Sequence, residues 1–246
     1  MQELKRNELE ELKSFLVDEG WVDGLFQILF LLEDAKIGVY LQGEKKRRKL
    51  KQLRNMLYWF DLYVSMRHGG YATKNKGLYK DWNKFFGFKV DAEKFLGYPH
   101  CCVRVHNLHI PVSVIHLYSL IKEIRFGRKS INDFRQFLVN LRFLHHNLCK
   151  SNCIESINLE RRFESVIRKY SWLVSGLLPD FDKTKIKGLI PSLELLPTQL
   201  RKEDFRDRNL LFELEINPRD IAEIVENERA FRENFEYGKP LLESFL

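Results

Sequence analysis

The chain lacks a long hydrophobic run. No stretch reaches the roughly 18 uncharged apolar residues that a membrane-spanning helix needs, and the longest candidate, residues 25–32, is interrupted by Gln27 and followed by Glu33. The first eleven residues carry charges of both signs and lack the apolar segment of a signal peptide. We therefore expect a cytoplasmic protein with no membrane partner.

Motifs of well-known enzyme classes are also missing. The sequence contains no Walker-type glycine loop, no dinucleotide-binding G-x-G-x-x-G after a strand, no H-E-x-x-H and no G-x-S-x-G. The run DFDK at residues 180–183 is superficially similar to a nuclease motif, but it is flanked by prolines and no strand with further catalytic residues follows. The sequence supports no enzyme class; it leaves a catalytic role open and favours a non-enzymatic one.

Apolar residues are plentiful, at 44% of the chain, which is enough for a real core. Helical spacing predicts helices over residues 2–18, 22–34, 112–126, 131–149 and 159–173. Two short β-prone runs, residues 37–41 and 62–66, flank a helix over residues 44–58, and this order is typical of a βαβ unit. The expected fold class is α+β, predominantly helical, with a small sheet from that unit.

Proline and charge divide the chain into two expected parts. Residues 1–175 should form the helical core, whereas residues 176–246 should form a proline-rich connector and an acidic helical C-terminal segment. Residues 203–246 contain 12 acidic and 6 basic residues, and since the whole chain carries +7, the first 202 residues carry about +13. A basic body of this kind suggests a polyanionic partner, although lysine-rich surfaces often serve only solubility.

Cysteine and histidine form the constellation with the clearest chemical promise. Its members fall in two segments about fifty residues apart and are Cys101, Cys102, His145, His146, Cys149 and Cys153. The first segment follows the turn GYP at residues 97–99, and the second closes the helix predicted over residues 131–149. If that helix runs on, His145, Cys149 and Cys153 share a face at i, i+4 and i+8, and His146 neighbours Cys149 at i, i+3. A cysteine of the first segment would complete four ligands.

Four such ligands suit zinc, with an iron–sulfur cluster as the alternative. The spacing departs from the usual pair of Cys-x2–4-Cys knuckles, because one end is Cys-x3-Cys and the other has adjacent cysteines, which seldom both bind one ion. Inert packing stays open, since free cysteine behaves as a small hydrophobe, and so does a thiol-redox site. A disulfide framework is disfavoured because cytoplasmic thiols stay reduced.

The segment FLGYPHCCV at residues 95–103 resembles the LGYPxCCV signature of an uncharacterised prokaryotic family, the domain of unknown function numbered 483. Related sequences tend to carry a later histidine and a Cys-x3-Cys segment, which His145 or His146 with Cys149 and Cys153 resembles, although Leu148 stands where proline is common. The resemblance covers residues 37–156. It implies no activity, only that the four cysteines act together.

A strongly basic stretch precedes a group of aromatic residues. Its cations are Lys45, Lys46, Arg47, Arg48, Lys49, Lys51 and Arg54, and Tyr58, Trp59, Phe60 and Tyr63 follow them. Cations beside aromatic rings are what phosphate contact and base stacking require, and RNA is favoured over DNA because no helix-turn-helix is recognisable. The alternative is a solvated helix face above aromatic core residues.

Three functional hypotheses follow from these features. The first is a non-enzymatic RNA- or ribonucleoprotein-associated protein, possibly bound to ribosomes, with the Cys/His cluster as a structural metal site. The second is a metalloenzyme or thiol-redox protein that uses the same cysteines. The third is an interaction scaffold that forms a homodimer through a helical face such as residues 3–32.

Overall fold

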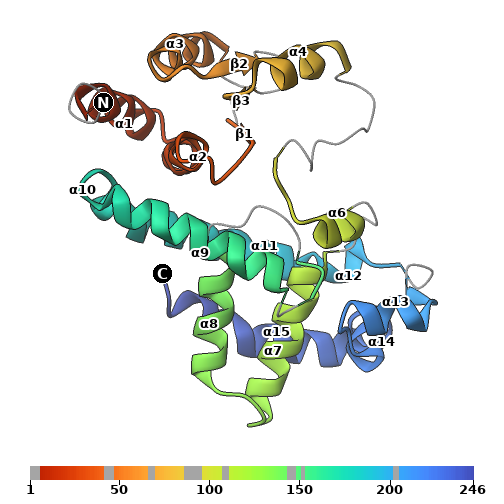
Figure 1. Ribbon diagram of the computed structural model, residues 1–246. Helices are drawn as coiled ribbons and strands as arrows, with labels where there is room; N and C mark the ends of the chain where they lie inside the picture. The colour runs from red at the N-terminus through yellow and green to blue at the C-terminus, as the bar shows by residue number, and fades with distance from the viewer. Residues whose placement is uncertain are drawn as a thin grey trace. The chain divides into compact units, whose positions relative to one another are not determined.

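The computed structural model describes residues 6–41, 47–65, 70–85, 96–106, 111–142, 148–150, 153–201 and 205–246. Helices dominate and a small sheet accompanies them, which confirms the predominantly helical α+β class (Figure 1). The chain forms a first unit, Met1–Tyr98 with Arg161–Leu178, and a second unit, Pro99–Glu160 with Pro179–Leu246. This division differs from the expected one at residue 175, because the chain passes from one unit to the other three times, after residues 98, 160 and 178. Within the described ranges, every helix is too short or too polar to cross a membrane.

The first unit begins with two helices whose apolar faces are buried. Its helices are α1 (Arg6–Asp18), α2 (Val22–Leu32), α3 (Arg47–Leu57), α4 (Lys76–Phe85) and α10 (Ser171–Val174), with 3-10 turns at Tyr58–Phe60 and Ser175–Leu177. Helix α1 buries Leu9, Leu12 and Leu16, which recur at the spacing of one helix face. Helix α2 is buried over every residue from Leu25 to Leu31. These faces are covered within one chain, so they give no support to a homodimer through residues 3–32.

The sheet of the first unit has three antiparallel strands in the order β1 (Gly38–Tyr40), β3 (Tyr71–Thr73), β2 (Tyr63–Ser65). Val39 and Val64 both pair with Ala72, and all three side chains are buried on one face. The two predicted strands exist, and because both run antiparallel to β3 they run parallel to each other, as in a βαβ unit, although they do not pair directly. A three-residue strand that the sequence pattern did not reveal lies between them.

Gly70 explains how the third strand enters the sheet. It has a φ of 90°, which L side chains rarely adopt, and a Cβ there would lie 2.8 Å from Leu50 Cδ1 of α3. Its carbonyl accepts the Leu41 N–H at 2.9 Å, just beyond β1. The backbone therefore turns against α3 at the one residue type that fits.

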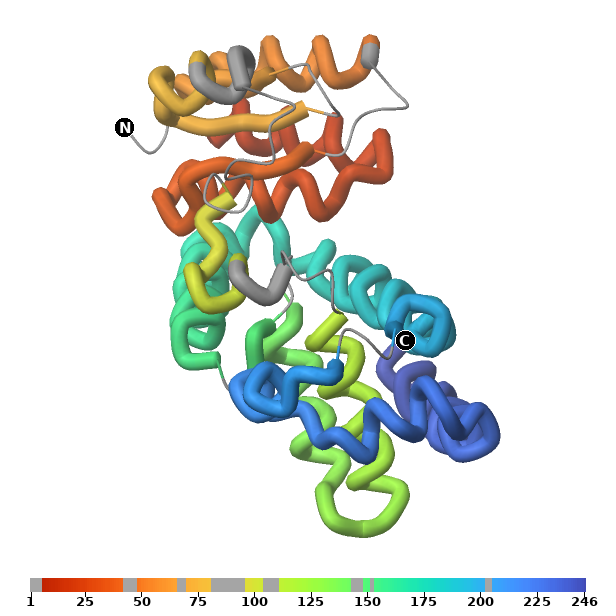
Figure 2. The backbone as a smooth tube through the Cα atoms, turned by 90° about the vertical axis from the view of Figure 1, so that its right-hand side faces the viewer, coloured from red at the N-terminus to blue at the C-terminus, as the bar shows by residue number. Residues whose placement is uncertain are grey.

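The second unit is entirely helical within its described residues. Its helices are α6 (His100–His106), α7 (Val112–Arg125), α8 (Ile131–Leu141), α11 (Leu178–Glu194), α12 (Leu196–Gln199), α13 (Arg208–Glu213), α14 (Pro218–Glu226) and α15 (Glu228–Glu243). Helix α9 (Ile154–Lys169) begins in this unit and ends in the first. Figure 2 shows α7 and α8 as an antiparallel hairpin, closed at Gly127 with a φ of 70°.

Helix α11 replaces the expected proline-rich connector, and that expectation is wrong. Pro179 occupies the second position of the helix, where an amide donor is not needed. Pro191 lies inside the helix near its C-terminal end, and the chain continues helically as its carbonyl accepts the Leu195 N–H at 2.9 Å. Buried Phe181, Ile186 and Leu193 offset the local cost of proline by packing into the core.

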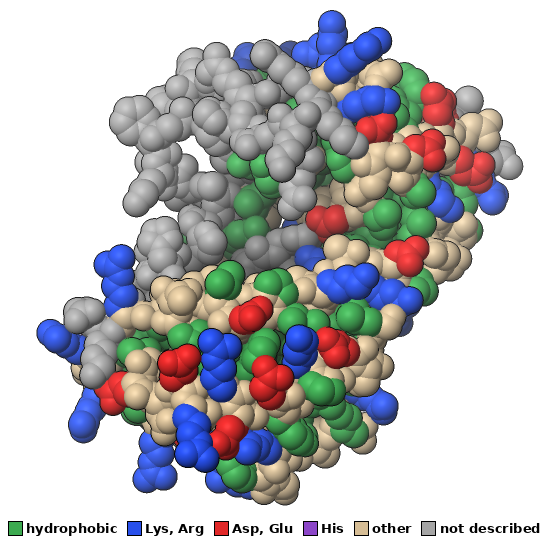
Figure 3. Space-filling model, turned by 180° about the vertical axis from the view of Figure 1, so that it is seen from behind, with side chains coloured by type: hydrophobic (Ala, Val, Ile, Leu, Met, Phe, Trp, Pro, Cys, Tyr) green, Lys and Arg blue, Asp and Glu red, His purple; other side chains and the backbone are tan. Residues whose placement is uncertain are grey.

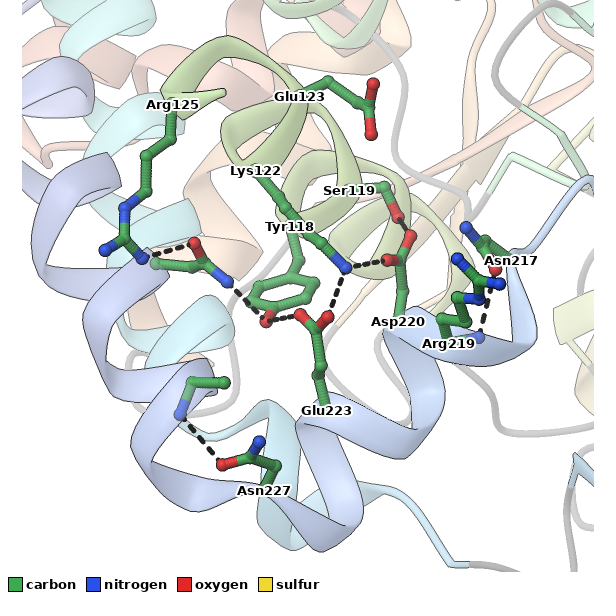
Figure 4. Close-up of polar contacts among 12 residues, drawn as sticks. Tyr118, Ser119, Lys122, Glu123, Arg125, Asn217, Arg219, Asp220, Glu223 and Asn227 are labelled. Atoms are coloured by element: carbon green, nitrogen blue, oxygen red, sulfur yellow. Dashed lines mark hydrogen bonds and ion pairs between the residues drawn. The ribbon is translucent and has the colours of Figure 1, made fainter. Parts of the chain in front are cut away.

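Three of the C-terminal acidic residues, Asp220, Glu223 and Glu233, pair with side chains at the basic end of α7. Lys122 donates to Asp220 at 2.8 Å and also to Glu223, both on α14, and Tyr118 donates to Glu223 at 3.1 Å (Figure 4). Asn234 of α15 donates to the Tyr118 hydroxyl at 3.0 Å. A polar network thus ties α7, α14 and α15 together inside the second unit.

Candidate metal centre

Four cysteine sulfurs converge in the second unit. The Sγ atoms of Cys101, Cys102, Cys149 and Cys153 all lie within 4.8 Å of one another. Cys101 Sγ and Cys153 Sγ are 3.6 Å apart, Cys102 Sγ and Cys153 Sγ are 3.7 Å apart, and the two adjacent cysteines have their sulfurs 3.9 Å apart. All four are free thiols. The prediction that the two cysteine segments meet in one cluster is confirmed.

Helix α6 positions the first two cysteines. Gly97 turns the chain at a φ of 73°, and the Pro99 carbonyl accepts the amides of Cys102 at 2.9 Å and Val103 at 3.0 Å. Both cysteines therefore lie in the first helical turn, as the GYP turn predicted. Their side chains leave the helix about 100° apart, yet both sulfurs reach the cluster. The sulfurs of both adjacent cysteines are therefore within reach of a single ion.

The second pair comes from a turn and a helix start, not from one continuous helix. Helix α8 ends at Leu141 and α9 begins at Ile154, so the expected run of a helix through Cys149 is wrong. Leu148 donates its amide to Ser113 Oγ of α7 at 2.8 Å, and the Cys153 amide donates to the Lys150 carbonyl at 3.3 Å. The intervening Lys-Ser-Asn sequence is rich in residue types that favour turns and caps over helix interiors.

Cys153 precedes α9 as its N-terminal cap. Its sulfur is 3.7 Å from Cys102 Sγ, and Ser156, three residues on, gives it both side-chain and backbone hydrogen bonds. The hydrogen bond from Cys102, followed by those from Ser156, lowers the pKa of the Cys153 thiol to about 4 against the cost of burial. Amides and positive dipole at a helix start favour an anion, so Cys153 is the thiol of the cluster whose ionisation the surroundings favour most.

The pKa values of the other three thiols are raised, by burial and by hydrogen bonds to the Cys153 sulfur. Burial, reinforced by Cys153, raises the pKa of Cys101 to about 12. The hydrogen bond to Cys153 and burial raise the pKa of Cys102, and burial raises the pKa of Cys149. Without a bound cation, four neighbouring sulfurs cannot all be anionic because like charges repel at this distance. A metal cation would remove that restriction by compensating the thiolates.

The cluster is enclosed by the core. Cys102, Cys149 and Cys153 are buried and belong to the hydrophobic core of the second unit with Val112 and Ile115, while Cys101 is half-exposed. Glu155 Oε2 lies 3.5 Å from Cys101 Sγ on the exposed side. Ser113 and Ser156 support the site and were not anticipated. The Cys-x2-Ser spacing at 153–156 is the signal that could have indicated the latter.

The two predicted histidine ligands, His145 and His146, lie outside the described residues. The four sulfurs by themselves supply the full number of ligands that a tetrahedral site takes.

The predicted nucleic-acid-binding residues fall into different environments on α3. Lys45 and Lys46 lie outside the described residues, and Arg47 is the first residue of the helix. Lys49 forms an ion pair with Glu19 at 2.7 Å and lies over the Phe15 ring. Arg54 is half-buried, whereas Arg48 and Lys51 are exposed. Of the four cations whose side chains the structure describes, Arg48 and Lys51 are the two that are exposed and unpaired within the described ranges.

Comparisons of the chain with protein-family models, curated proteins and solved structures found no match. The resemblance of residues 95–103 to the uncharacterised prokaryotic family stays a prediction. Functional inference therefore depends on the site itself, which is a cluster of four cysteine sulfurs with the spacing and burial to hold a metal ion.

Proposed function

We propose that the protein holds one zinc ion in a structural four-cysteine centre. The observation that carries this proposal is the spacing of the sulfurs. A tetrahedral ion with bonds of about 2.3 Å to sulfur needs ligands about 3.8 Å apart, and three of the sulfur–sulfur distances are 3.6, 3.7 and 3.9 Å. Sulfurs in simple contact have similar spacing, but inert packing gives no reason for four cysteines from two segments about fifty residues apart to converge within 4.8 Å of one another.

A single ion accounts for the geometry better than an iron–sulfur cluster does. In a four-iron cluster each cysteine binds a different iron, so its ligand sulfurs must be farther apart than the edge of a tetrahedron around one ion. The sulfurs here all lie within 4.8 Å. Zinc is the commonest ion in closed four-cysteine sites, and a single iron in the same position is the alternative that metal analysis separates.

A structural role fits better than a catalytic one. Catalytic zinc keeps a position open for water or substrate, whereas four cysteines close the coordination sphere. Three of the four sulfurs belong to buried residues, and the site joins the first turn of α6 to the N-terminus of α9. The same closure argues against the metalloenzyme and thiol-redox alternatives.

Metal analysis of protein purified under reducing conditions, without metal-affinity steps, tests this proposal. We expect close to one zinc per chain, and cobalt substitution should give the intense sulfur-to-cobalt absorption of a four-thiolate site. Cys149→Ser and Cys101→Ser should each lower the metal content, whereas Ser192→Ala, at a half-buried serine of α11 outside the cysteine cluster, serves as the control and should keep it. Protein that is free of metal, yet equally stable with and without added zinc, contradicts the proposal.

We further propose RNA or ribonucleoprotein association as the role of the folded protein. Support comes from the net charge of +7 and from the exposed cations of α3. Figure 3 shows Lys and Arg side chains gathered over α3, while acidic and basic side chains alternate over the helices of the second unit. Binding to bulk cellular RNA should weaken steeply with salt, because each phosphate contact releases counterions. Absence of binding at low salt removes this role and leaves the metal centre untouched.

A further inference from the structure

One face of α3 and of the turn that follows it is exposed along its whole length. Arg48, Lys51, Asn55, Tyr58 and Trp59 form this face, called the α3 face below, and all five side chains are exposed. Their spacing of three, four, three and one residues places them within about 100° of one another around the helix, over a length of about 15 Å. Cations occupy its first half and aromatic rings its second half.

The structure separates these cations from the others on the same helix. Lys49 is engaged by Glu19 at 2.7 Å, and Leu50, Leu53 and Leu57 hold the opposite side of α3 in the core. Helix α3 contains no acidic residue between Arg47 and Leu57. Arg48 and Lys51 therefore face solvent in a locally positive field, which favours an anionic ligand.

Folding leaves two adjacent large rings partly exposed beside these cations. Tyr58 is 54% exposed and Trp59 is 43% exposed, whereas the next residue, Phe60, is 4% exposed and belongs to the core. No ring contact joins either residue to another aromatic side chain among the described residues. Burial of such large rings is strongly favourable. Two adjacent, partly exposed rings lie beside Arg48 and Lys51, which form no ion pair within the described part of the chain, and this combination points to a ligand that stacks.

We propose that the α3 face binds single-stranded RNA, with bases stacking on Tyr58 and Trp59 and backbone phosphates on Arg48 and Lys51. This inference rests on the proposed RNA association and specifies its site and strand type. A single strand is required because bases in a duplex already stack on one another and cannot cover a protein ring. Asn55 lies between the cations and the rings, where its amide can hydrogen-bond a base edge or a 2′-hydroxyl.

Titration of a fluorescently labelled oligouridine strand at several salt concentrations, with an RNA duplex of equal length in parallel, tests the proposal. We expect the single strand to bind more tightly than the duplex. Replacing both rings, Tyr58→Ala with Trp59→Ala, should weaken single-strand binding at least tenfold at every salt concentration without changing the salt slope. Replacing both cations, Arg48→Gln with Lys51→Gln, should weaken binding and reduce the slope by about 0.7 for each charge removed.

Matched variants on the second unit control for general effects of charge and surface. Lys183→Gln with Lys187→Gln removes two exposed cations from α11, and Phe212→Ala removes a ring that is 85% exposed. Both should bind as the parent does. Equal affinity of the ring variant and the parent overturns the stacking inference and leaves the RNA association standing. A duplex that binds as tightly as the single strand has the same meaning. A parent that binds neither RNA contradicts the proposed RNA association as well. Unchanged thermal unfolding of each variant shows that the fold is intact.

Discussion

Cys153 occupies a position at which helices usually carry serine, threonine, aspartate or asparagine. Its sulfur accepts hydrogen bonds from Ser156 in the first turn of α9, so one atom is both a helix cap and a metal ligand candidate. The same bonds that lower the pKa of the thiol also satisfy amides that the helix itself cannot pair. Loss of this residue should therefore affect the local fold as well as the metal.

His116 is the second residue whose environment leads to a prediction. Its side chain is buried, its Nε2 atom has no hydrogen-bond partner among the described residues, and its other nitrogen bonds to the Leu214 carbonyl. Burial lowers its pKa to about 4, against the smaller opposing effects of Leu214 and Asp220. Because the pKa is lower in the folded chain than its ordinary 6.5, the unfolded chain binds the proton more readily.

The free energy of unfolding should therefore fall as the pH is lowered from about 6.5 toward 4, and His116 alone contributes up to about 3 kcal/mol to that fall. His116→Asn keeps a donor for Leu214 and removes the titration. In urea unfolding, the fall in the free energy of unfolding between pH 7 and pH 5 should be about 2 kcal/mol smaller in the variant than in the parent. Metal loss at acid pH affects both proteins alike and cancels in this difference. An identical pH dependence in the two proteins contradicts the prediction.

Helix α7 connects most of the second unit. Through Ser113 it holds the turn before Cys149, and through Tyr118 and Lys122 it holds α14 and α15. Gly238 of α15 lies so close that a Cβ there would be 2.6 Å from Ile121 Cδ1. The stacked rings of Tyr118 and Phe231 add a contact with centroids 5.4 Å apart. Close packing and polar hydrogen bonds thus both hold α7 against α15.

Lys122 should be the most sensitive charged residue of this helix. It is 11% exposed and pairs with Asp220, 6% exposed, and Glu223, 26% exposed. Although burial disfavours its charge, the two carboxylates raise the pKa of Lys122 above its usual value. Lys122→Met leaves two carboxylates close together and uncompensated, so we expect a loss of about 3–5 kcal/mol in the free energy of unfolding.

The control for this prediction is Arg229→Met on α15. Arg229 pairs with Glu233 at 3.2 Å but is 91% exposed, and exposed pairs of this kind contribute at most about 1 kcal/mol. Urea unfolding of the two variants at neutral pH separates buried from exposed pairs. Equal losses would show that the network on α7 is no more important than a surface pair.

The whole molecule shows where sequence patterns predict structure and where they do not. A long amphipathic helix such as α1 was predicted because about a dozen residues repeat one spacing. The cysteine cluster was predicted because both cysteine segments lie near the ends of predicted helices. That prediction holds even when the helix boundaries are only approximately known. Strand β3 has three residues, too few for any period to be visible. The prolines of α11 suggested a connector because local propensity says nothing of the buried side chains that stabilise that helix.

The division into two units leads to the last prediction, which concerns metal removal. All four cysteines belong to the second unit, whereas the first unit has its own contacts, such as the stacked rings of Phe30 and Phe163 at 4.2 Å. Because a closed metal site contributes to folding free energy, a strong chelator under reducing conditions should lower the melting temperature and raise amide hydrogen exchange in α6, in α7 and over residues 154–160. Exchange in α1, α2 and β1 should change little. Cys149→Ser with zinc present should reproduce the pattern of the chelated parent, since each lacks a complete site. Equal increases in both units would show that the centre stabilises the chain as one cooperative structure, and no increase would show that it has no structural role.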